Sequence, residues 1–150
     1  MGITGSASAH VAAPPDEVFA RITDIGRLPE WNEIMTRVIE RPDALVPGSQ
    51  WVVEFHAMGG TWRSRSTLQE IDPASRRFAY RSQTDDGNPS FAVWSWEVAE
   101  ENGGSRVQLS WDVNPKTFWR RVLLARIRSR QLRKEVPESL AALAGAAVRG

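Results

Sequence analysis

The feature that most constrains the fold is a series of short runs in which apolar and polar side chains alternate. The runs are residues 37–41, 51–58, 61–71, 77–84, 91–99 and 106–113. They are separated by turn-forming residues: Pro47-Gly48, Gly59-Gly60, Asp72-Pro73, residues 85–89 (DDGNP) and residues 102–104 (NGG). Successive side chains of a β-strand point to opposite faces, and connections this short join antiparallel neighbours. The pattern therefore predicts an antiparallel meander of strands.

The residues before the meander predict one more strand and two short helices. Residues 4–11 alternate, with Ala7, Ala9 and Val11 on the apolar face. Residues 13–24 (APPDEVFARITD) predict a helix, because Pro15 suits a first turn and acidic residues follow it near the positive end of the helix dipole. Gly26 ends that helix, and residues 25–35 (IGRLPEWNEIM) predict a second.

The last third of the chain predicts one long amphipathic helix. At 100° per residue, an apolar stripe runs from Phe118 to Ala147 and keeps its phase across Pro137. Such a stripe suits a helix that covers the inner face of the sheet. The expected architecture is an α+β fold, in which a curved seven-stranded antiparallel sheet wraps around a long C-terminal helix. We expect a single domain spanning residues 1–150.

Composition excludes several classes of function. The chain has no cysteine, so thiolate chemistry and zinc–thiolate sites are impossible. No run approaches the ~18 apolar residues of a membrane span, and the N-terminus lacks an apolar signal core, so we expect a cytoplasmic protein. His10 and His56 are widely spaced, and no phosphate loop or nucleophile elbow is present. We therefore expect no metal and no cofactor.

Several segments resemble the polyketide cyclase/dehydrase branch of the START-like (SRPBCC, helix-grip, Bet v 1-like) superfamily. The segments are residues 6–35, 47–51 (PGSQW), 68–81 (LQEIDPASRRFAYR) and 94–111 (WSWEVAEENGGSRVQLSW). Members include aromatase/cyclases and lipid carriers. The resemblance implies a deep hydrophobic cavity between the sheet and the long helix, with Trp31 near its mouth. It does not name a ligand.

Alternation identifies the side chains that would line such a cavity. The strand at 61–71 places a tryptophan, two serines and a leucine on one face and two arginines on the other. The expected ligand-binding residues are Trp31, Phe55, Trp62, Ser64, Ser66, Phe78, Tyr80, Ser82, Trp94, Trp96 and Trp111. Aromatic side chains with a few hydroxyls suit a flat, mostly apolar molecule that carries some oxygen. The alternative is that the tryptophans are ordinary core residues and the serines relieve crowding.

The same strand bears on the choice between enzyme and binder. In the aromatase/cyclases that the chain resembles, this strand has the pattern Trp-x-Ser-x-Arg with the arginine inward. Trp62 and Ser64 match, but Ser66 stands where the arginine is expected, and Arg63 and Arg65 belong to the opposite face. An inward arginine would stabilise a developing oxyanion. The absence of that arginine therefore favours a binder or carrier of a small hydrophobic ligand over a cyclase.

A third hypothesis concerns the basic stretch between Lys116 and Lys134. It holds eight basic residues and no acidic one, and Trp119, Leu123 and Ile127 lie off the apolar stripe. This combination suits an anionic membrane or an acidic protein surface. Arginines that merely face solvent or pair with the acidic sheet are the alternative. The remaining residues are acidic overall, which opposes nucleic acid as a partner. Either a monomer or a homodimer is compatible with the sequence.

Overall fold

The protein is described by a computed structural model that covers residues 3–32, 34–57, 59–84 and 91–114. Its elements in chain order are β1 (Ile3–Val11), α1 (Pro15–Thr23), the 3₁₀ helix η1 (Ile25–Glu30), β2 (Met35–Glu40), β3 (Gln50–Ala57), β4 (Gly60–Asp72), β5 (Arg77–Thr84), β6 (Phe91–Glu101) and β7 (Gly104–Asn114). The helix expected at 118–147 and the basic stretch from Lys116 to Lys134 lie outside the described residues.

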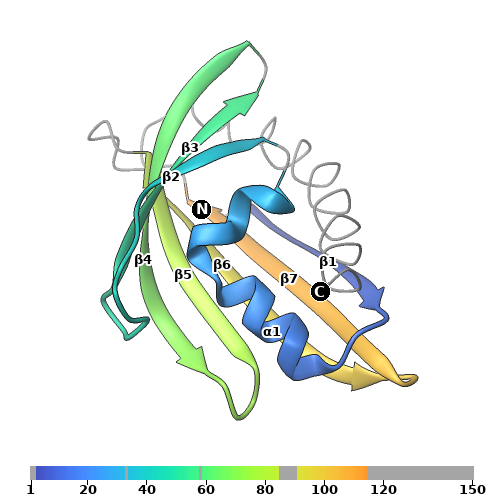
Figure 1. The fold of residues 1–150 in the computed structure, drawn as a ribbon. Helices are drawn as coiled ribbons and strands as arrows, with labels where there is room; N and C mark the ends of the chain where they lie inside the picture. The colour runs from blue at the N-terminus through green and yellow to red at the C-terminus, as the bar shows by residue number, and fades with distance from the viewer. Residues whose placement is uncertain (1–2, 33, 58, 85–90, 115–150) are drawn as a thin grey trace.

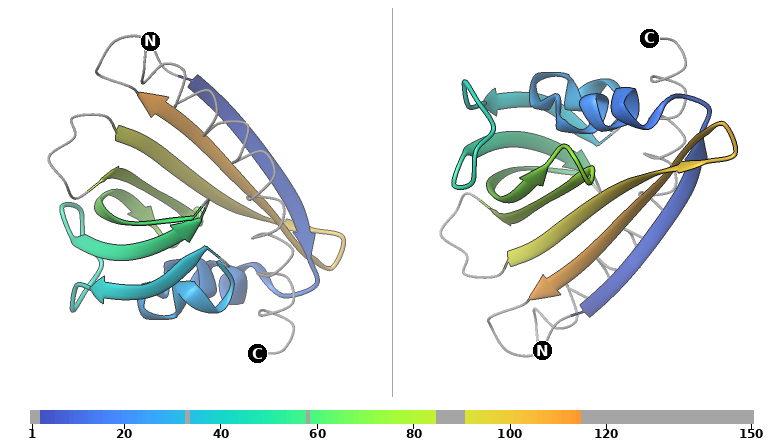
Figure 2. Two further views of the ribbon diagram at one scale, coloured as in Figure 1. Left: turned by 90° about the horizontal axis from the view of Figure 1, so that it is seen from above. Right: turned by 90° about the horizontal axis from the view of Figure 1, so that it is seen from below.

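The strands form one antiparallel sheet, as the meander predicts. The strand order is β1-β7-β6-β5-β4-β3-β2, so each strand from β2 to β7 pairs with its neighbour in sequence and β1 joins the far edge beside β7. Figure 1 shows the strands in sequence, and Figure 2 shows that the sheet is strongly curved. The helices α1 and η1 lie on its concave side.

Helix α1 forms where the sequence predicts it. Pro15 occupies its first turn, where a missing N–H costs nothing, and Asp16 and Glu17 lie near the positive end of the helix dipole. Its buried face consists of Val18, Phe19 and Ile22. This face contacts β6 and β7, so the helix closes one end of the concave side.

The second helix is shorter than the sequence predicts. It is a 3₁₀ segment that ends at Glu30, and Met35 already begins β2. Pro29 has no backbone N–H to donate within the helix. The Asn32 side chain then donates to the Leu28 carbonyl at 2.9 Å, which satisfies an acceptor at the helix end. Trp31 therefore lies just past the helix and not within it.

A β-bulge in β4 keeps apolar residues on the concave side. Leu68 pairs with Tyr80 and Glu70 pairs with Ala79, so Gln69 is the extra residue. The bulge shifts the alternation by one position, so Leu68 is buried in the core and Ile71 packs against the core. Two further irregularities lie in β2. Simple alternation along one strand does not predict these shifts.

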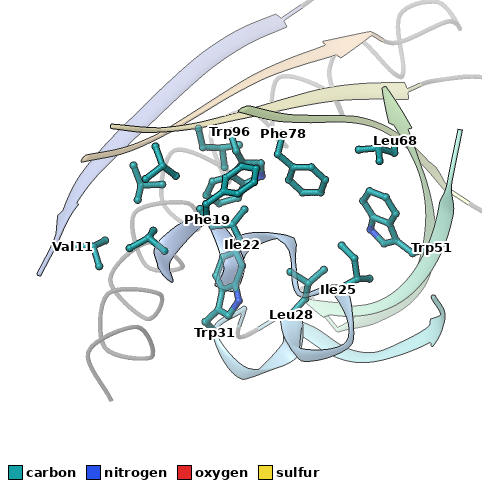
Figure 3. Close-up of a cluster of buried hydrophobic side chains, with 14 of the residues drawn as sticks. Val11, Phe19, Ile22, Ile25, Leu28, Trp31, Trp51, Leu68, Phe78 and Trp96 are labelled. Atoms are coloured by element: carbon teal, nitrogen blue, oxygen red, sulfur yellow. The ribbon is translucent and has the colours of Figure 1, made fainter. Parts of the chain in front are cut away.

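The core fills the space between the two helical segments and the sheet. In Figure 3, Phe19, Ile22 and Leu28 point from the helices toward Phe78 and Trp96 on the sheet. Ser105 is fully buried, and its hydroxyl donates to the Ala13 carbonyl at 2.7 Å. This hydrogen bond fixes the chain that enters α1 to the first residues of β7.

Candidate functional site

Strand register places the sequence-predicted site residues of the sheet on one face. Directly paired residues of neighbouring strands share a face. The relevant pairs are Phe55 with Trp62, Trp51 with Ser66, Val53 with Ser64, Ser66 with Ser82, Leu68 with Tyr80, Tyr80 with Trp94, Phe78 with Trp96, and Trp94 with Trp111. Trp31 meets the same face from beyond η1, with its ring edge-on to Trp96 at 5.7 Å between centroids. The structure therefore brings the predicted site residues together on the concave side.

Aromatic rings contact one another along this concave face. Trp51 stacks on Phe78 at 5.9 Å and meets Tyr80 edge-on at 5.1 Å. Phe55 stacks on Trp62 at 5.5 Å between centroids. Trp94 and Trp111 lie 6.5 Å apart. Offset and edge-on pairs of this kind hold ring orientations in place, so the face is an ordered aromatic wall.

Burial separates the predicted site residues and Trp51 on this face into two groups. Trp31, Trp51, Phe78, Trp96 and Trp111 are buried and belong to the core. Phe55, Trp62, Tyr80, Ser82 and Trp94 are only partly buried. The first group forms the floor of the concave face. The second group keeps surface that another molecule could contact.

Two hydroxyls on β5 are each held by a tryptophan of β6. The indole N–H of Trp94 donates to Ser82 Oγ at 2.7 Å, and the indole N–H of Trp96 donates to the Tyr80 hydroxyl oxygen at 3.5 Å. Burial raises the pKa of Tyr80 to about 12, although the Trp96 hydrogen bond acts in the opposite direction. The phenol therefore stays protonated at neutral pH.

Two further hydroxyls are more deeply buried on β4. Ser64 is 9% exposed and Ser66 is 3% exposed. Ser66 pairs directly with Ser82, and Ser64 pairs directly with Thr84. Thr84 was not among the predicted site residues, although the alternation of β5 that identified Tyr80 and Ser82 also places it inward. In the described part of the chain, neither Ser64 nor Ser66 makes a side-chain hydrogen bond.

The arginines of β4 lie on the convex side, as alternation predicts. Arg65 Nη1 lies 3.3 Å from Glu40 Oε2 and donates to Gln50 Oε1 at 3.3 Å. Arg63 lies 3.9 Å from Glu54. A hydrogen bond from Arg37 is the main reason that the pKa of Glu54 is below its usual value. These guanidinium groups are committed to the outer face and are not directed at the concave one.

The convex side has a polar hollow of its own. Its volume is about 280 Å³, and it is lined by Glu70, Arg77, Phe78, Ala79, Ser95, Trp96, Glu97, Gln108 and Ser110. The two aromatic residues point inward, so the polar and small side chains define its surface. This hollow lies across the sheet from the aromatic wall.

The two histidines occupy exposed positions. His10 lies 3.3 Å from Glu101, and His56 lies 3.0 Å from the Thr61 hydroxyl. Within the described ranges, no group of three or more histidine, cysteine or carboxylate residues is arranged to hold a metal ion. Over the same residues, no helix is long and apolar enough to cross a lipid bilayer.

Comparisons with known proteins agree with this architecture. The sequence model of a family described as polyketide cyclase/dehydrase and lipid transport matches residues 3–148. No curated protein matches the sequence.

Solved structures show the same fold at low identity. The Zhui aromatase/cyclase from Streptomyces sp. R1128 superimposes with a TM-score of 0.80 at 19% identity, covering 99% of this chain and 95% of that one. Protein TTHA0849 from Thermus thermophilus has a TM-score of 0.78 at 18% identity, with 98% of each chain covered. Major latex-like protein 151 from Panax ginseng has a TM-score of 0.75 at 10% identity, with 97% of each chain covered. The described elements thus have the Bet v 1-like, helix-grip arrangement.

Proposed function

Because the chain belongs to the polyketide cyclase/dehydrase and lipid transport family, we propose that it binds a small, flat, largely apolar molecule on the concave side of its sheet. The observation that carries this proposal is the place of Tyr80 in the aromatic wall, where its ring lies 5.1 Å from that of Trp51 and 5.2 Å from that of Phe78 between centroids. Its side chain keeps some accessible surface, yet protein surrounds it closely enough to raise its pKa to about 12. Phe55, Trp62 and Trp94 on the same face are likewise only partly buried, so the aromatic wall keeps surface that a flat molecule could contact.

The buried hydroxyls support a ligand over a fully packed core. A core without a ligand would gain most from aliphatic side chains at the positions of Ser64 and Ser66. These hydroxyls have no hydrogen-bond partner among the described residues, and they share the concave face with Trp62 and Trp94, which are only partly buried. Water or ligand oxygen would satisfy them.

A cyclase is the second candidate function, suggested by the Zhui aromatase/cyclase among the similar structures. The residue at issue is Ser66, which is inward, buried and uncharged. We place binding ahead of catalysis because Arg65 is held on the convex side by Glu40 and Gln50. Removing one donor that stabilises an oxyanion typically costs about 10²–10³ in rate. Rapid cyclisation of a poly-β-ketone by this protein, unchanged in a Ser66→Ala variant, would contradict our assignment.

The test of the binding proposal is a titration of purified protein with aromatic, polyketide-like and fatty-acid probes, followed by tryptophan fluorescence and calorimetry. A Ser82→Phe variant fills the concave side, and Ser95→Phe adds the same ring to the exposed side of the next strand. We expect aromatic probes to bind the wild type and Ser95→Phe, and to bind Ser82→Phe at least tenfold more weakly. Absence of binding by every probe class to a folded wild-type protein would refute the proposal.

A further inference from the structure

Tyr80 and Ser82 form a repeated arrangement with the tryptophans of β6. The two residues are separated by one position on β5, so they share a face and their Cα atoms are about 7 Å apart. Trp94 pairs with Tyr80 but donates to Ser82, and Trp96 pairs with Phe78 but donates to Tyr80. Each indole thus reaches diagonally to the hydroxyl two residues along β5. The same geometry occurs twice in succession.

This arrangement determines the direction of the two hydroxyl protons. An indole N–H can only donate, so each hydroxyl oxygen must accept from it. The hydroxyl proton then points elsewhere, and accepting a hydrogen bond makes that proton a better donor. No acceptor for either proton is found in the described part of the chain. Tyr80 also retains its proton throughout the neutral range, because burial raises its pKa to about 12.

The inward positions of β4 and β5 add further donors and no charge. Ser66 lies directly opposite Ser82 and is 3% exposed, with no hydrogen bond to any described residue. Apart from the neutral Tyr80, the inward positions of β4 and β5 carry no ionisable side chain; these positions are Trp62, Ser64, Ser66, Leu68, Ile71, Phe78, Tyr80, Ser82 and Thr84. A carboxylate placed here would lose its hydration without gaining a counter-charge.

We propose that Tyr80 and Ser82 select a neutral ligand whose edge carries carbonyl oxygens, such as a ketone or quinone of a fused-ring molecule. This inference rests on the proposed binding function and names the chemical class that the concave side prefers. Hydrocarbons of the same shape leave the hydroxyl protons without an acceptor. Fatty acids and aromatic acids bring a charge that no described side chain on the inward faces of β4 and β5 neutralises.

The experiment compares fluorene, fluorenone and a fluorene carboxylate, which share one ring skeleton. Binding is measured by two-dimensional ¹⁵N NMR, in which the indole N–H signals of Trp94 and Trp96 report on the hydroxyls they hold. We expect fluorenone to bind about threefold to tenfold tighter than fluorene, the usual effect of one neutral hydrogen bond. The carboxylate should bind more weakly than fluorenone. Fluorenone should also shift at least one of the two indole signals more than fluorene does.

Three variants assign the effect to the two hydroxyls. Tyr80→Phe and Ser82→Ala should each reduce the preference for fluorenone over fluorene, and the double variant should reduce it to twofold or less. Ser95→Ala, which removes an exposed hydroxyl between the two tryptophans on the opposite face, should keep the wild-type preference. Thermal unfolding of each variant establishes that it is folded before its preference is compared.

The outcomes separate the inference from the function on which it rests. Equal binding of fluorene and fluorenone, or tightest binding of the carboxylate, would overturn the selection by Tyr80 and Ser82 while leaving an aromatic binding site intact. A fluorenone preference that survives in the double variant would overturn it as well. Failure of all three probes to bind the folded wild type would refute the binding function and the inference together.

Discussion

Tryptophan has more than one role on the concave side of this sheet. Trp51 and Trp111 are 2% exposed and contribute mainly apolar contact area. Trp94 keeps some exposed surface and positions a hydroxyl with its N–H. Within the described residues, the indole nitrogens of Trp31 and Trp111 are buried without a hydrogen-bond partner. At these two positions, packing of the large ring outweighs the cost of an unpaired donor.

Trp111 also explains the glycine at position 5. These residues pair directly, and the indole of Trp111 occupies the space that a side chain on Gly5 would need. We expect Gly5→Ala to lower the free energy of unfolding by about 1–3 kcal/mol, the usual cost of overpacking. The measurement is urea denaturation followed by far-UV circular dichroism. Ser6→Ala, on the exposed side of the same strand, should change stability by less than about 0.5 kcal/mol. An unchanged Gly5→Ala midpoint would show that Trp111 can move aside freely.

The sequence predicted which side chains share a face of each strand, but it did not predict where the alternation along a strand is interrupted. The faces of β4, β5 and β6 follow from alternation, because a strand has a fixed period of two. The bulge at Gln69 was not predicted, because it depends on the register between β4 and β5. Likewise, periodicity placed Trp51 and Trp94 on the same face but could not show that only Trp94 keeps exposed surface, since burial depends on the packing of neighbouring elements. The diagonal hydrogen bonds from β6 to β5 also require the paired strands.

The β4–β5 turn depends on one carboxylate. Asp72 accepts hydrogen bonds from the Ser75 hydroxyl at 2.8 Å and from the backbone N–H of Ala74 at 3.1 Å. The bond from Ser75 is the main cause of the lowered pKa of Asp72. A lowered pKa in the folded state means that ionised Asp72 stabilises the fold above its unfolded pKa. That contribution is lost as the pH falls through the folded pKa.

We therefore expect Asp72→Asn to be less stable than the wild type at pH 7, with a difference that shrinks as the pH falls below about 4. The measurement is the denaturation midpoint of both proteins between pH 7 and pH 3. Asp43→Asn is the control, because its side chain makes no hydrogen bond within the described residues, and its difference from the wild type should not follow this pH dependence. A gap for Asp72→Asn that widens toward low pH would contradict the role given to the carboxylate.

At the scale of the whole molecule, charge is unevenly distributed along the chain. The stretch from Lys116 to Lys134 holds 8 of the 19 basic residues, which leaves 11 basic and 18 acidic residues elsewhere. From the sequence, we predict that this stretch binds anionic lipid vesicles. Binding should weaken strongly between 0.1 M and 1 M salt, because the screening length falls from about 10 Å to about 3 Å. Flotation with vesicles should also detect weaker binding by an Arg120→Glu/Arg121→Glu variant. Indifference to anionic vesicles at low salt would exclude a membrane partner.

The pairing of β1 with β7 has a consequence for how the protein is made. Val11 meets Ser105 and Ile3 meets Val113, which are separated along the chain by 94 residues (105 − 11) and 110 residues (113 − 3). At roughly 5–20 residues per second, a ribosome that has made β1 needs on the order of 5–20 s to supply its partner strand. During that interval the hairpins from β2 onward can form from local contacts, while β1 and the apolar face of α1 have no sheet to join. Of the described strands, β1 therefore waits longest after its synthesis for a partner strand, and its edge stays unpaired for that time.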